Sequence, residues 1–147
     1  MILTSNIGAE LLKKGRVGFG SEAKADREAV LSEVSRYFRA EFMNRLDAIL
    51  FFSPLSYESL VRIADNLLSE LSERLLSVGI SACFDASVAS FLIDEKECAR
   101  FGVRAIRRAM VERLENFFAD ALIKGALREG ACVRVFCEDG AVKTETV

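Results

Sequence analysis

The stretch CVRVFCEDGAVKTET, residues Cys132–Thr146, carries the plainest structural signal in the chain. Apolar and polar residues alternate on both sides of Asp139-Gly140, a dipeptide typical of two-residue β-hairpin turns. The pattern predicts two antiparallel strands, Cys132–Cys137 and Ala141–Thr146. Ile80–Phe84 alternates in the same way and predicts a third, half-buried strand.

Two helices are predicted on either side of that third strand. Ser56 is a suitable N-cap for a long helix with Glu58 in its first turn, and Gly79 ends this helix. Asp85 is expected to cap a shorter helix that reaches Ile93. The long helix has one apolar stripe at helical spacing, made of Leu60, Ile63, Ala64, Leu67, Leu71 and Leu75.

The last predicted helix runs from Arg104 to Lys124, opened by Phe101-Gly102 and followed by Gly125. Asp94–Arg100 is expected to be a charged connection that leads into it. Its stripe consists of Ile106, Met110, Leu114, Phe117 and Ala121. The resulting order predicts an α+β domain in which helices pack on a three-stranded sheet.

The N-terminal third is less regular. Met1–Thr4 is interpreted as the last residues of a strand, Ile7–Lys14 as a short helix and Gly15–Lys24 as a flexible loop. The tripeptide Val17-Gly18-Phe19 places two large apolar side chains in that loop. It predicts either an exposed apolar patch or a loop that folds back onto the body of the protein.

A helix is predicted from Asp26, its N-cap, through Tyr37. Its apolar side consists of Val30, Leu31, Val34 and Phe38. Phe38–Arg45 should continue as a short helix or turn. Ile49–Phe52 is predicted to be a buried strand that stops at Ser53-Pro54, because proline cannot continue a central ladder.

Composition narrows the possible functions. The 147 residues are 51% hydrophobic, and 20 Lys and Arg against 22 Asp and Glu give a net charge of −2, which argues against nucleic-acid binding through phosphates. We expect no membrane partner, because apolar runs of roughly 18–20 residues and a signal peptide are both absent from the sequence.

The sequence has no histidine and no C-x-x-C pair, so we expect no metal site. The four cysteines are expected to be small, buried or half-buried thiols in a reducing cytosol.

Arg45 stands out within Phe38–Asp47, which holds two arginines and two carboxylates before an apolar run. One interpretation is a surface arginine paired with Asp47 or Glu41. The other is a guanidinium held at a rigid junction to meet a phosphate, since its fork binds two phosphate oxygens and stays charged. Both interpretations remain open on the residues alone.

Arg104 and Asn6 are the other polar candidates. Arg104 would lie in the first turn of the last helix, where the helix dipole repels a cation unless an anion joins it. The alternative is the basic face of a solvated helix. Asn6 follows the predicted strand end in Thr4-Ser5-Asn6, where such residues commonly cap or turn the chain.

Four stretches in this order resemble a known family: Leu3–Ala9, Val17–Phe19, Phe38–Asp47 and Phe101–Arg108. Together they resemble the C-terminal part of the second ATPase module of a Clp-class AAA+ unfoldase of the ClpC/ClpA type. The first resembles the sensor-1 segment, the second the peptidase-docking loop, the third the arginine-finger box and the fourth the sensor-2 box. The resemblance covers essentially the whole chain.

The resemblance implies a role for each candidate residue. Asn6 would be the sensor that helps place the attacking water, and Arg45 the finger that reaches the γ-phosphate held by the next subunit. Arg104 would contact the phosphates of ATP bound by its own subunit. Val17, Gly18 and Phe19 would dock on a ClpP-type peptidase.

At the level of the whole protein, the resemblance implies a cytoplasmic homo-hexamer that uses ATP with Mg²⁺ to unfold protein substrates, with adaptors, and to pass them to the peptidase. Residues 1–54 would be the remnant of the large AAA+ domain, with sensor 1, docking loop and arginine finger. Residues 55–147 would be the small domain with sensor 2. We expect the half from Ser56 onward to be the stable core, and the segment before about Phe38 to be loosely held.

Some family features are missing. Ala40 and Ala105 stand where the family commonly has proline, which relaxes two turns without moving either arginine. Neither G-x-x-x-x-G-K-[ST] nor an apolar strand ending in paired acids occurs in the chain. By itself, the chain should therefore neither hold ATP tightly nor hydrolyse it.

Two other hypotheses are kept. One is a free-standing α+β protein-interaction module with no role in nucleotide chemistry. The other is a disaggregase relative that never meets a peptidase. Val17-Gly18-Phe19 argues against the second, because that branch resembles this chain elsewhere but lacks the tripeptide.

Overall fold

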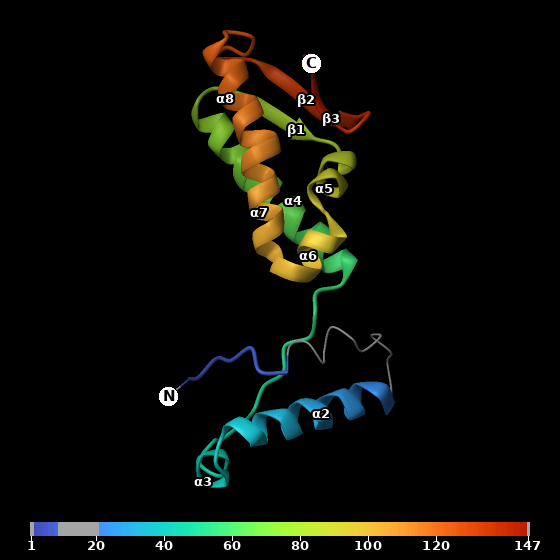
Figure 1. The fold of residues 1–147 in the computed structure, drawn as a ribbon. Helices are drawn as coiled ribbons and strands as arrows, with labels where there is room; N and C mark the ends of the chain where they lie inside the picture. Colours follow the sequence, from blue (N-terminus) through green and yellow to red (C-terminus); the bar gives the residue numbers. More distant parts are fainter. Residues whose placement is uncertain (1, 9–20, 147) are drawn as a thin grey trace. The chain divides into compact units, whose positions relative to one another are not determined.

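The computed structural model describes residues 2–8 and 21–146 (Figure 1). The chain divides into two compact units, Met1–Pro54 and Leu55–Val147, which we call the N-terminal and C-terminal units. Each unit is described by itself below.

The N-terminal unit contains the helices α2 (Ser21–Tyr37) and α3 (Ala40–Met43). The prediction that this helix begins at Asp26 is wrong, because α2 starts five residues earlier and includes residues assigned to a loop. Neither glycine nor proline follows Gly20 in this stretch, so nothing in the sequence stops the helix from extending to Ser21. The predicted apolar side is confirmed, with Val30 buried and Leu31, Val34 and Phe38 half-buried.

Both strands predicted in this unit are wrong. Ile2–Thr4 and Ile49–Phe52 have no regular secondary structure, and Leu50 and Phe52 are 78% and 86% exposed. A strand is stable only when a neighbour satisfies its backbone groups and covers one face. The described part of this unit contains no strand with which either segment could pair. Within the predicted helix Ile7–Lys14, only the turn at Ile7 and Gly8 is described; the remainder lies outside the described residues.

The C-terminal unit begins with the predicted long helix, α4 (Tyr57–Ser77). The hydroxyl of Ser56 accepts a hydrogen bond from the Ser59 amide at 3.2 Å, which confirms the N-cap. At the other end Gly79 has φ +80°, and the amide of Ile80 donates to the carbonyl of Leu75 at 2.9 Å. This Schellman arrangement requires the left-handed conformation that glycine adopts without strain.

The predicted three-stranded sheet is confirmed. It consists of β1 (Ser81–Phe84), β2 (Cys132–Glu138) and β3 (Ala141–Thr146) in the order β1-β2-β3. β1 pairs with β2 in parallel, and β2 pairs with β3 antiparallel. Asp139 and Gly140 both have positive φ, 53° and 73°, as a type I′ hairpin turn requires.

Three helical segments follow β1. The shorter helix appears as predicted, α5 (Ala86–Leu92), but Asp94–Arg100 is not a connection: it forms α6 (Glu95–Phe101) with its N-cap. The carboxylate of Asp94 accepts hydrogen bonds from the amides of Lys96 and Glu97 at 2.9 and 3.1 Å. This cap satisfies two orphan amides, so even a charged heptapeptide starts a helix here.

The last helix is confirmed, with an interruption. It consists of α7 (Val103–Met110), a π-helical turn η1 (Val111–Glu115) and α8 (Asn116–Ile123). A π turn holds one residue more than an α turn and shifts the facing of everything after it. Phe118, four residues after the buried Leu114, is the buried residue of α8, whereas Phe117, predicted for the stripe, is half-buried.

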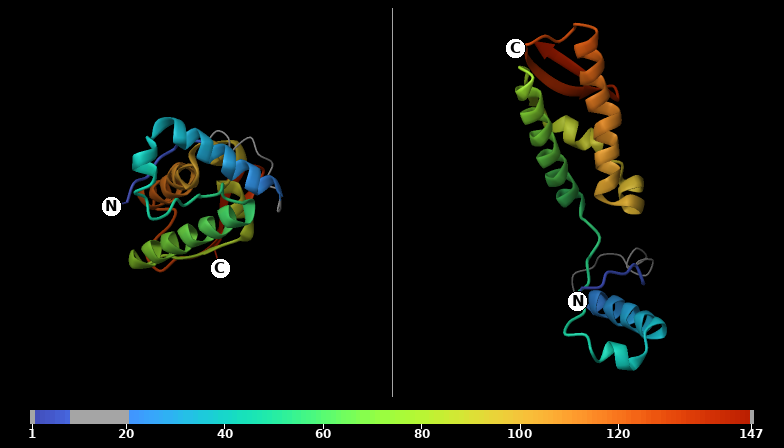
Figure 2. Two further views of the ribbon diagram at one scale, coloured as in Figure 1. Left: turned by 90° about the horizontal axis from the view of Figure 1, so that it is seen from below. Right: turned by 90° about the vertical axis from the view of Figure 1, so that its left-hand side faces the viewer.

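One face of the sheet carries the core. Figure 2 shows α4 and the continuous helix α7–η1–α8 running side by side, with the sheet at one end. The side chains of Ala82, Val133 and Val135 are buried against these helices. Every member of the main buried cluster belongs to the C-terminal unit. Within the described parts of the chain, no helix has the length and apolar character to cross a membrane.

Candidate functional site

Arg45 lies in the turn that ends α3. Its amide donates to the carbonyl of Phe42 at 3.0 Å, and the rings of Phe38 and Phe42 stack at 5.0 Å between centroids, joining α3 to the end of α2. The side chain of Arg45 is exposed. Among the described residues it forms no ion pair, neither with Glu41 nor with Asp47. Its backbone is therefore held while its guanidinium faces solvent.

Asn6 belongs to the same unit. It is exposed, and it lies between residues of extended backbone and a turn at Ile7, whose amide donates to the hydroxyl of Ser5 at 3.2 Å. Gly8, with φ +78°, lies against α2: a Cβ there would be 2.8 Å from the Val30 side chain. This close approach ties the Asn6 segment to the helix. The tripeptide Val17-Gly18-Phe19 lies outside the described residues.

Arg104 belongs to the C-terminal unit, in the first turn of α7. Gly102 is both the last cap of α6 and the first cap of α7, with φ +61° and ψ −144°. Side-chain-bearing residues rarely adopt this backbone conformation, so glycine is what allows the chain to turn sharply here. Ala105 and Ile106 anchor the helix in the core, and Arg104 remains exposed.

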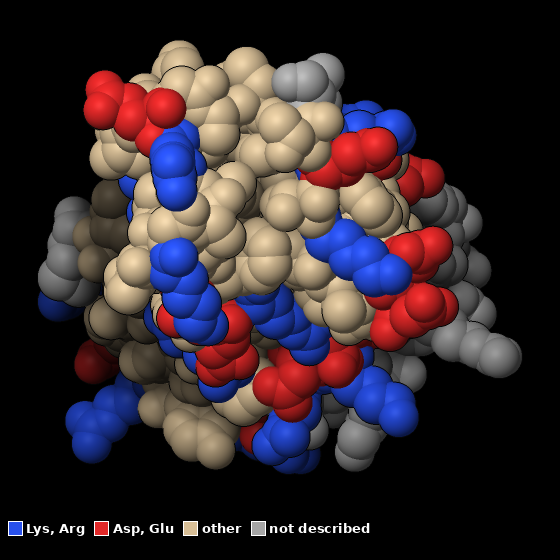
Figure 3. Space-filling model, turned by 90° about the horizontal axis from the view of Figure 1, so that it is seen from above, with Lys and Arg blue, Asp and Glu red and all other residues tan. Residues whose placement is uncertain are grey.

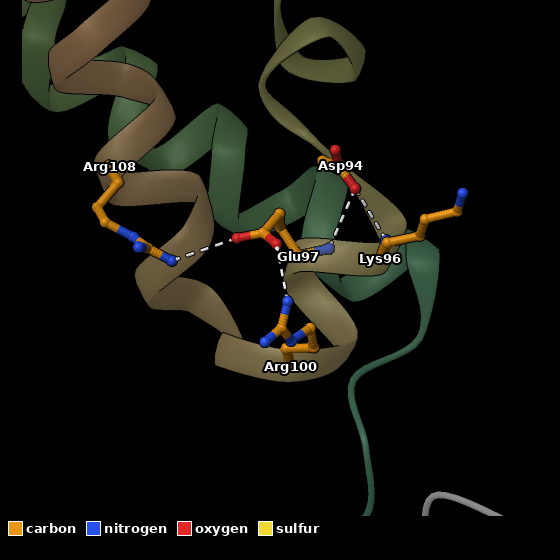
Figure 4. Close-up of polar contacts among 5 residues, drawn as sticks. All are labelled: Asp94, Lys96, Glu97, Arg100 and Arg108. Carbon is orange, nitrogen blue, oxygen red and sulfur yellow. Dashed lines mark hydrogen bonds and ion pairs between the residues drawn. The ribbon is translucent and has the colours of Figure 1, made fainter.

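A cluster of charges surrounds this α6–α7 corner (Figure 4). The Glu97 carboxylate lies 3.7 Å from a terminal nitrogen of Arg100 and 3.5 Å from one of Arg108. The guanidinium groups of Arg100 and Arg108 lie 5.2 and 4.6 Å from the centroid of the Phe101 ring. Exposed pairs of this kind contribute about 0–1 kcal/mol each, so the cluster fixes geometry more than it adds stability.

Two hollows lie on the surface of the C-terminal unit. The smaller, of about 130 Å³, is bordered by Asp94, Glu97 and Arg108. The larger, of about 520 Å³, lies between α4 and the last helix and has Glu70, Glu73, Arg74 and Arg107 on its wall. Neither hollow includes Arg104, so nothing in the described geometry encloses a ligand at that residue.

Charge on the C-terminal unit is mixed. On the face drawn in Figure 3, acidic and basic side chains lie interspersed around uncharged residues. On the exposed face of the sheet, the guanidinium of Arg134 donates to both carboxylate oxygens of Asp85 at 3.0 and 2.8 Å, which raises the pKa of Arg134. The carboxylate of Asp85 is thus committed to Arg134, and the prediction that this side chain caps α5 is wrong.

The Glu97 cluster was missed by reasoning from sequence. A signal was present, because Asp94 followed three residues later by Glu97 has the spacing of a helix capping box. Only the geometry shows that Glu97 turns toward the two arginines. Within the described ranges, no three Cys, Asp or Glu side chains are arranged to hold a metal ion.

Comparison with known proteins identifies the family to which this chain belongs. Residues 55–135 match the family described as the C-terminal, D2-small domain of ClpB protein. An ATP-dependent Clp protease ATP-binding subunit ClpA homolog of Cyanidium caldarium is 34% identical over 139 residues, which is 88% of this chain and 16% of the relative. The chaperone protein ClpB of Chlamydia muridarum is 36% identical over 156 residues, 99% of this chain and 17% of the relative.

A chloroplastic ClpA homolog of Brassica napus is 33% identical over 143 residues, 92% of this chain and 16% of the relative. The chain therefore spans about a sixth of the length of these curated relatives. The match defines the C-terminal unit as the small domain of an AAA+ ATPase, in agreement with its α+β fold. The chain belongs to the ClpB D2-small family, and so to the Clp class of AAA+ proteins.

Proposed function

We propose that the chain is the C-terminal part of the ATPase subunit of an ATP-dependent Clp protease, a homo-hexamer that unfolds protein substrates. The observation that carries the proposal is the pair of exposed arginines, Arg45 and Arg104, each on a fixed backbone and each without an ion-pair partner in the described parts of the chain. An arginine that serves phosphate must keep its fork available.

In this proposal each residue acts on ATP bound with Mg²⁺ in the complete subunit. Arg104 contacts the phosphates held by its own subunit, at the N-terminus of α7, where an anion relieves the repulsion between cation and helix dipole. Arg45 reaches the γ-phosphate held by the neighbouring subunit and stabilises the charge that develops during transfer. Asn6 helps place the attacking water.

The test uses the complete subunit, made by extending the reading frame upstream or by joining this chain to the N-terminal part of the Chlamydia muridarum relative. Arg45→Ala should keep nucleotide binding and lower turnover by roughly 10³-fold, the effect of removing an arginine finger. Arg39→Ala is the matched control, since Arg39 is an exposed arginine at the other end of α3. Normal hydrolysis by the Arg45 variant would show that this residue is structural.

Peptidase partnership is a separate part of the proposal. It depends on Val17-Gly18-Phe19 as a loop that docks on a ClpP-type peptidase, and the relatives named as Clp protease subunits support it. Removing Val17–Phe19 from the complete subunit should leave ATP hydrolysis intact and abolish peptidase binding. If a folded substrate is degraded at an unchanged rate, the docking assignment is wrong.

A second candidate function is a chaperone without a peptidase. The match to the ClpB small domain and the 36% identity to a chaperone protein ClpB favour it. The two candidates differ in one measurement: co-sedimentation of the complete subunit with the ClpP-type peptidase in the presence of a slowly hydrolysed ATP analogue. Binding supports the protease subunit, and absence of binding supports the chaperone.

A further inference from the structure

Four arginines surround the α6–α7 corner within nine residues: Arg100, Arg104, Arg107 and Arg108. All four are exposed, and residue type alone gives no reason for one of them to serve a phosphate rather than another. The described contacts separate them into three groups.

Arg100 and Arg108 are bound by one carboxylate. Glu97 lies 3.7 and 3.5 Å from their terminal nitrogens, and both guanidinium groups lie over the ring of Phe101. Glu97 itself is held, because its amide donates to the Asp94 cap at 3.1 Å (Figure 4). The capped helix end thus fixes the backbone of Glu97, whose carboxylate pairs with the two arginines.

Arg107 belongs to a different surface. It lies on the wall of the larger hollow, together with the carboxylates Glu70 and Glu73 of α4. Arg104 lies in neither hollow, and within the described residues it has no ion pair. Arg107 has no ion pair among the described residues either, but it borders the carboxylates of the larger hollow, whereas Arg104 lies outside both hollows.

Arg104 and Arg108 are four residues apart on one helix, so their side chains lie on the same face about 5–6 Å apart at Cβ. Two like charges at this spacing repel, and each could reach the same anion. Binding of Arg108 by Glu97 draws that guanidinium back toward α6 and Phe101. It removes a competing cation and leaves Arg104 at the helix N-terminus.

We propose that Glu97 is a positioning residue for Arg104: by holding Arg108 and Arg100 against Phe101, it makes Arg104 the phosphate-binding arginine of the corner. The proposal rests on the role of Arg104 in ATP binding given above. It concerns the choice among four arginines, which the family match by itself does not address.

The first experiment is a double-mutant cycle on the complete subunit with ATP. Glu97→Gln should raise KM for ATP by roughly threefold or more, as expected for coupled neighbours, with a smaller change in kcat. In an Arg104→Ala background the same change should have no further effect on KM. Equal effects in both backgrounds would overturn the proposal. Glu97→Asp should recover part of the loss, and Glu95→Gln is the matched control on α6.

The second experiment does not depend on nucleotide. The guanidinium ¹⁵N–H groups of the 147-residue chain are followed by NMR in the wild type and in Glu97→Gln. We expect the Arg108 signal to lose order and the Arg104 signal to shift, whereas Arg62 on α4 stays unchanged. Unchanged Arg104 and Arg108 signals would overturn the proposal. If Arg104→Ala leaves KM unchanged while these signals respond, the assigned ATP role is wrong and the positioning stands.

Discussion

The backbone conformation of Gly102 sets the direction in which α7, with Arg104 in its first turn, leaves α6. Its φ of +61° with ψ near −144° allows α6 to end and α7 to begin at one residue. Open space surrounds the position where a Cβ would be, so the restriction comes from the backbone and not from packing. A substitution there changes the corner without removing a contact.

Gly102→Ala should therefore destabilise the chain by about 1–3 kcal/mol, the cost of holding a side-chain-bearing residue in this region. The measurement is the midpoint of thermal unfolding followed by circular dichroism. Ala99→Ser, on the exposed side of α6, should change the midpoint little. An alanine variant as stable as the wild type would show that the corner relaxes to an ordinary conformation.

The four cysteines should differ in reactivity. Burial raises the pKa of the Cys98 thiol and of the Cys137 thiol above the ordinary value of 9.0, whereas Cys83 and Cys132 are exposed. Only the thiolate attacks a disulfide reagent. At pH 8, two thiols should react quickly with an aromatic disulfide and two slowly, and Cys83→Ser should remove one fast equivalent. Four equal rates would contradict this.

The two raised thiol pKa values also make the folding stability depend on pH. A raised thiol pKa means that the folded chain keeps protons that the unfolded chain has lost above about pH 9. Stability from this source is therefore complete below the ordinary thiol pKa, and it declines as pH rises through the raised values.

At the scale of elements, the last helix places one of two adjacent aromatic residues in the core. Phe118 is 2% exposed and meets Phe84 edge to face at 6.2 Å between ring centroids. Phe117 lies beside it, half-buried. Phe118 follows Leu114 by four residues, which keeps the two side chains on one face of the helix.

Phe118→Ala should cost about 3–5 kcal/mol of unfolding free energy, as truncation of a buried phenylalanine does. Phe117→Ala should cost clearly less, because part of its surface already contacts water. Urea unfolding of both variants measures the difference. Equal losses would mean that the two rings contribute equally to the core.

Patterns that depend on neighbouring residues were predictable from the sequence. Asp139-Gly140 gave the hairpin and Ser56 and Gly79 gave the limits of α4, because cap and turn chemistry acts over a few residues. The strand predicted at Ile49–Phe52 failed because an apolar run indicates burial only if a partner is present. The apolar period did not separate Phe117 from Phe118, because residues three and four positions after Leu114 both fit one helix face.

The candidate site was predictable only in part. Arg45 and Arg104 were found through motif spacing, and the structure describes both as exposed on fixed backbone. Glu97 and Phe101 were not recognised as partners of Arg100 and Arg108, because an ion pair between helices depends on how α6 and α7 meet. The sequence shows where the charged residues lie along the chain. The contacts that distinguish the four nearby arginines depend on the three-dimensional arrangement of the helices.

At the scale of the whole molecule, burial is unequal between the two units. The main buried cluster lies in the C-terminal unit, and Val30 is the one buried residue among those described in the N-terminal unit. Fixing each backbone residue costs about 1–2 kcal/mol, which has to be offset chiefly by apolar burial. The two units should therefore differ in their ability to fold alone.

Residues 55–147 should fold cooperatively as a separate polypeptide, with an unfolding midpoint within a few degrees of the whole chain. Residues 1–54 should not. Dispersed amide NMR signals for the first and collapsed ones for the second are the expected spectra. An aggregated or unfolded 55–147 fragment would show that the small domain needs the N-terminal unit for stability.

The parallel pairing of β1 with β2 has a consequence for synthesis. Ser81 lies opposite Cys132, so roughly 50 residues have to be made between the two partners, and such distant pairings form slowly. Until β2 is available to pair with it, the edge of β1 that faces β2 is uncovered. Nascent chains of this protein should thus pass through a period in which that edge can pair with other polypeptides, and β2 ends it.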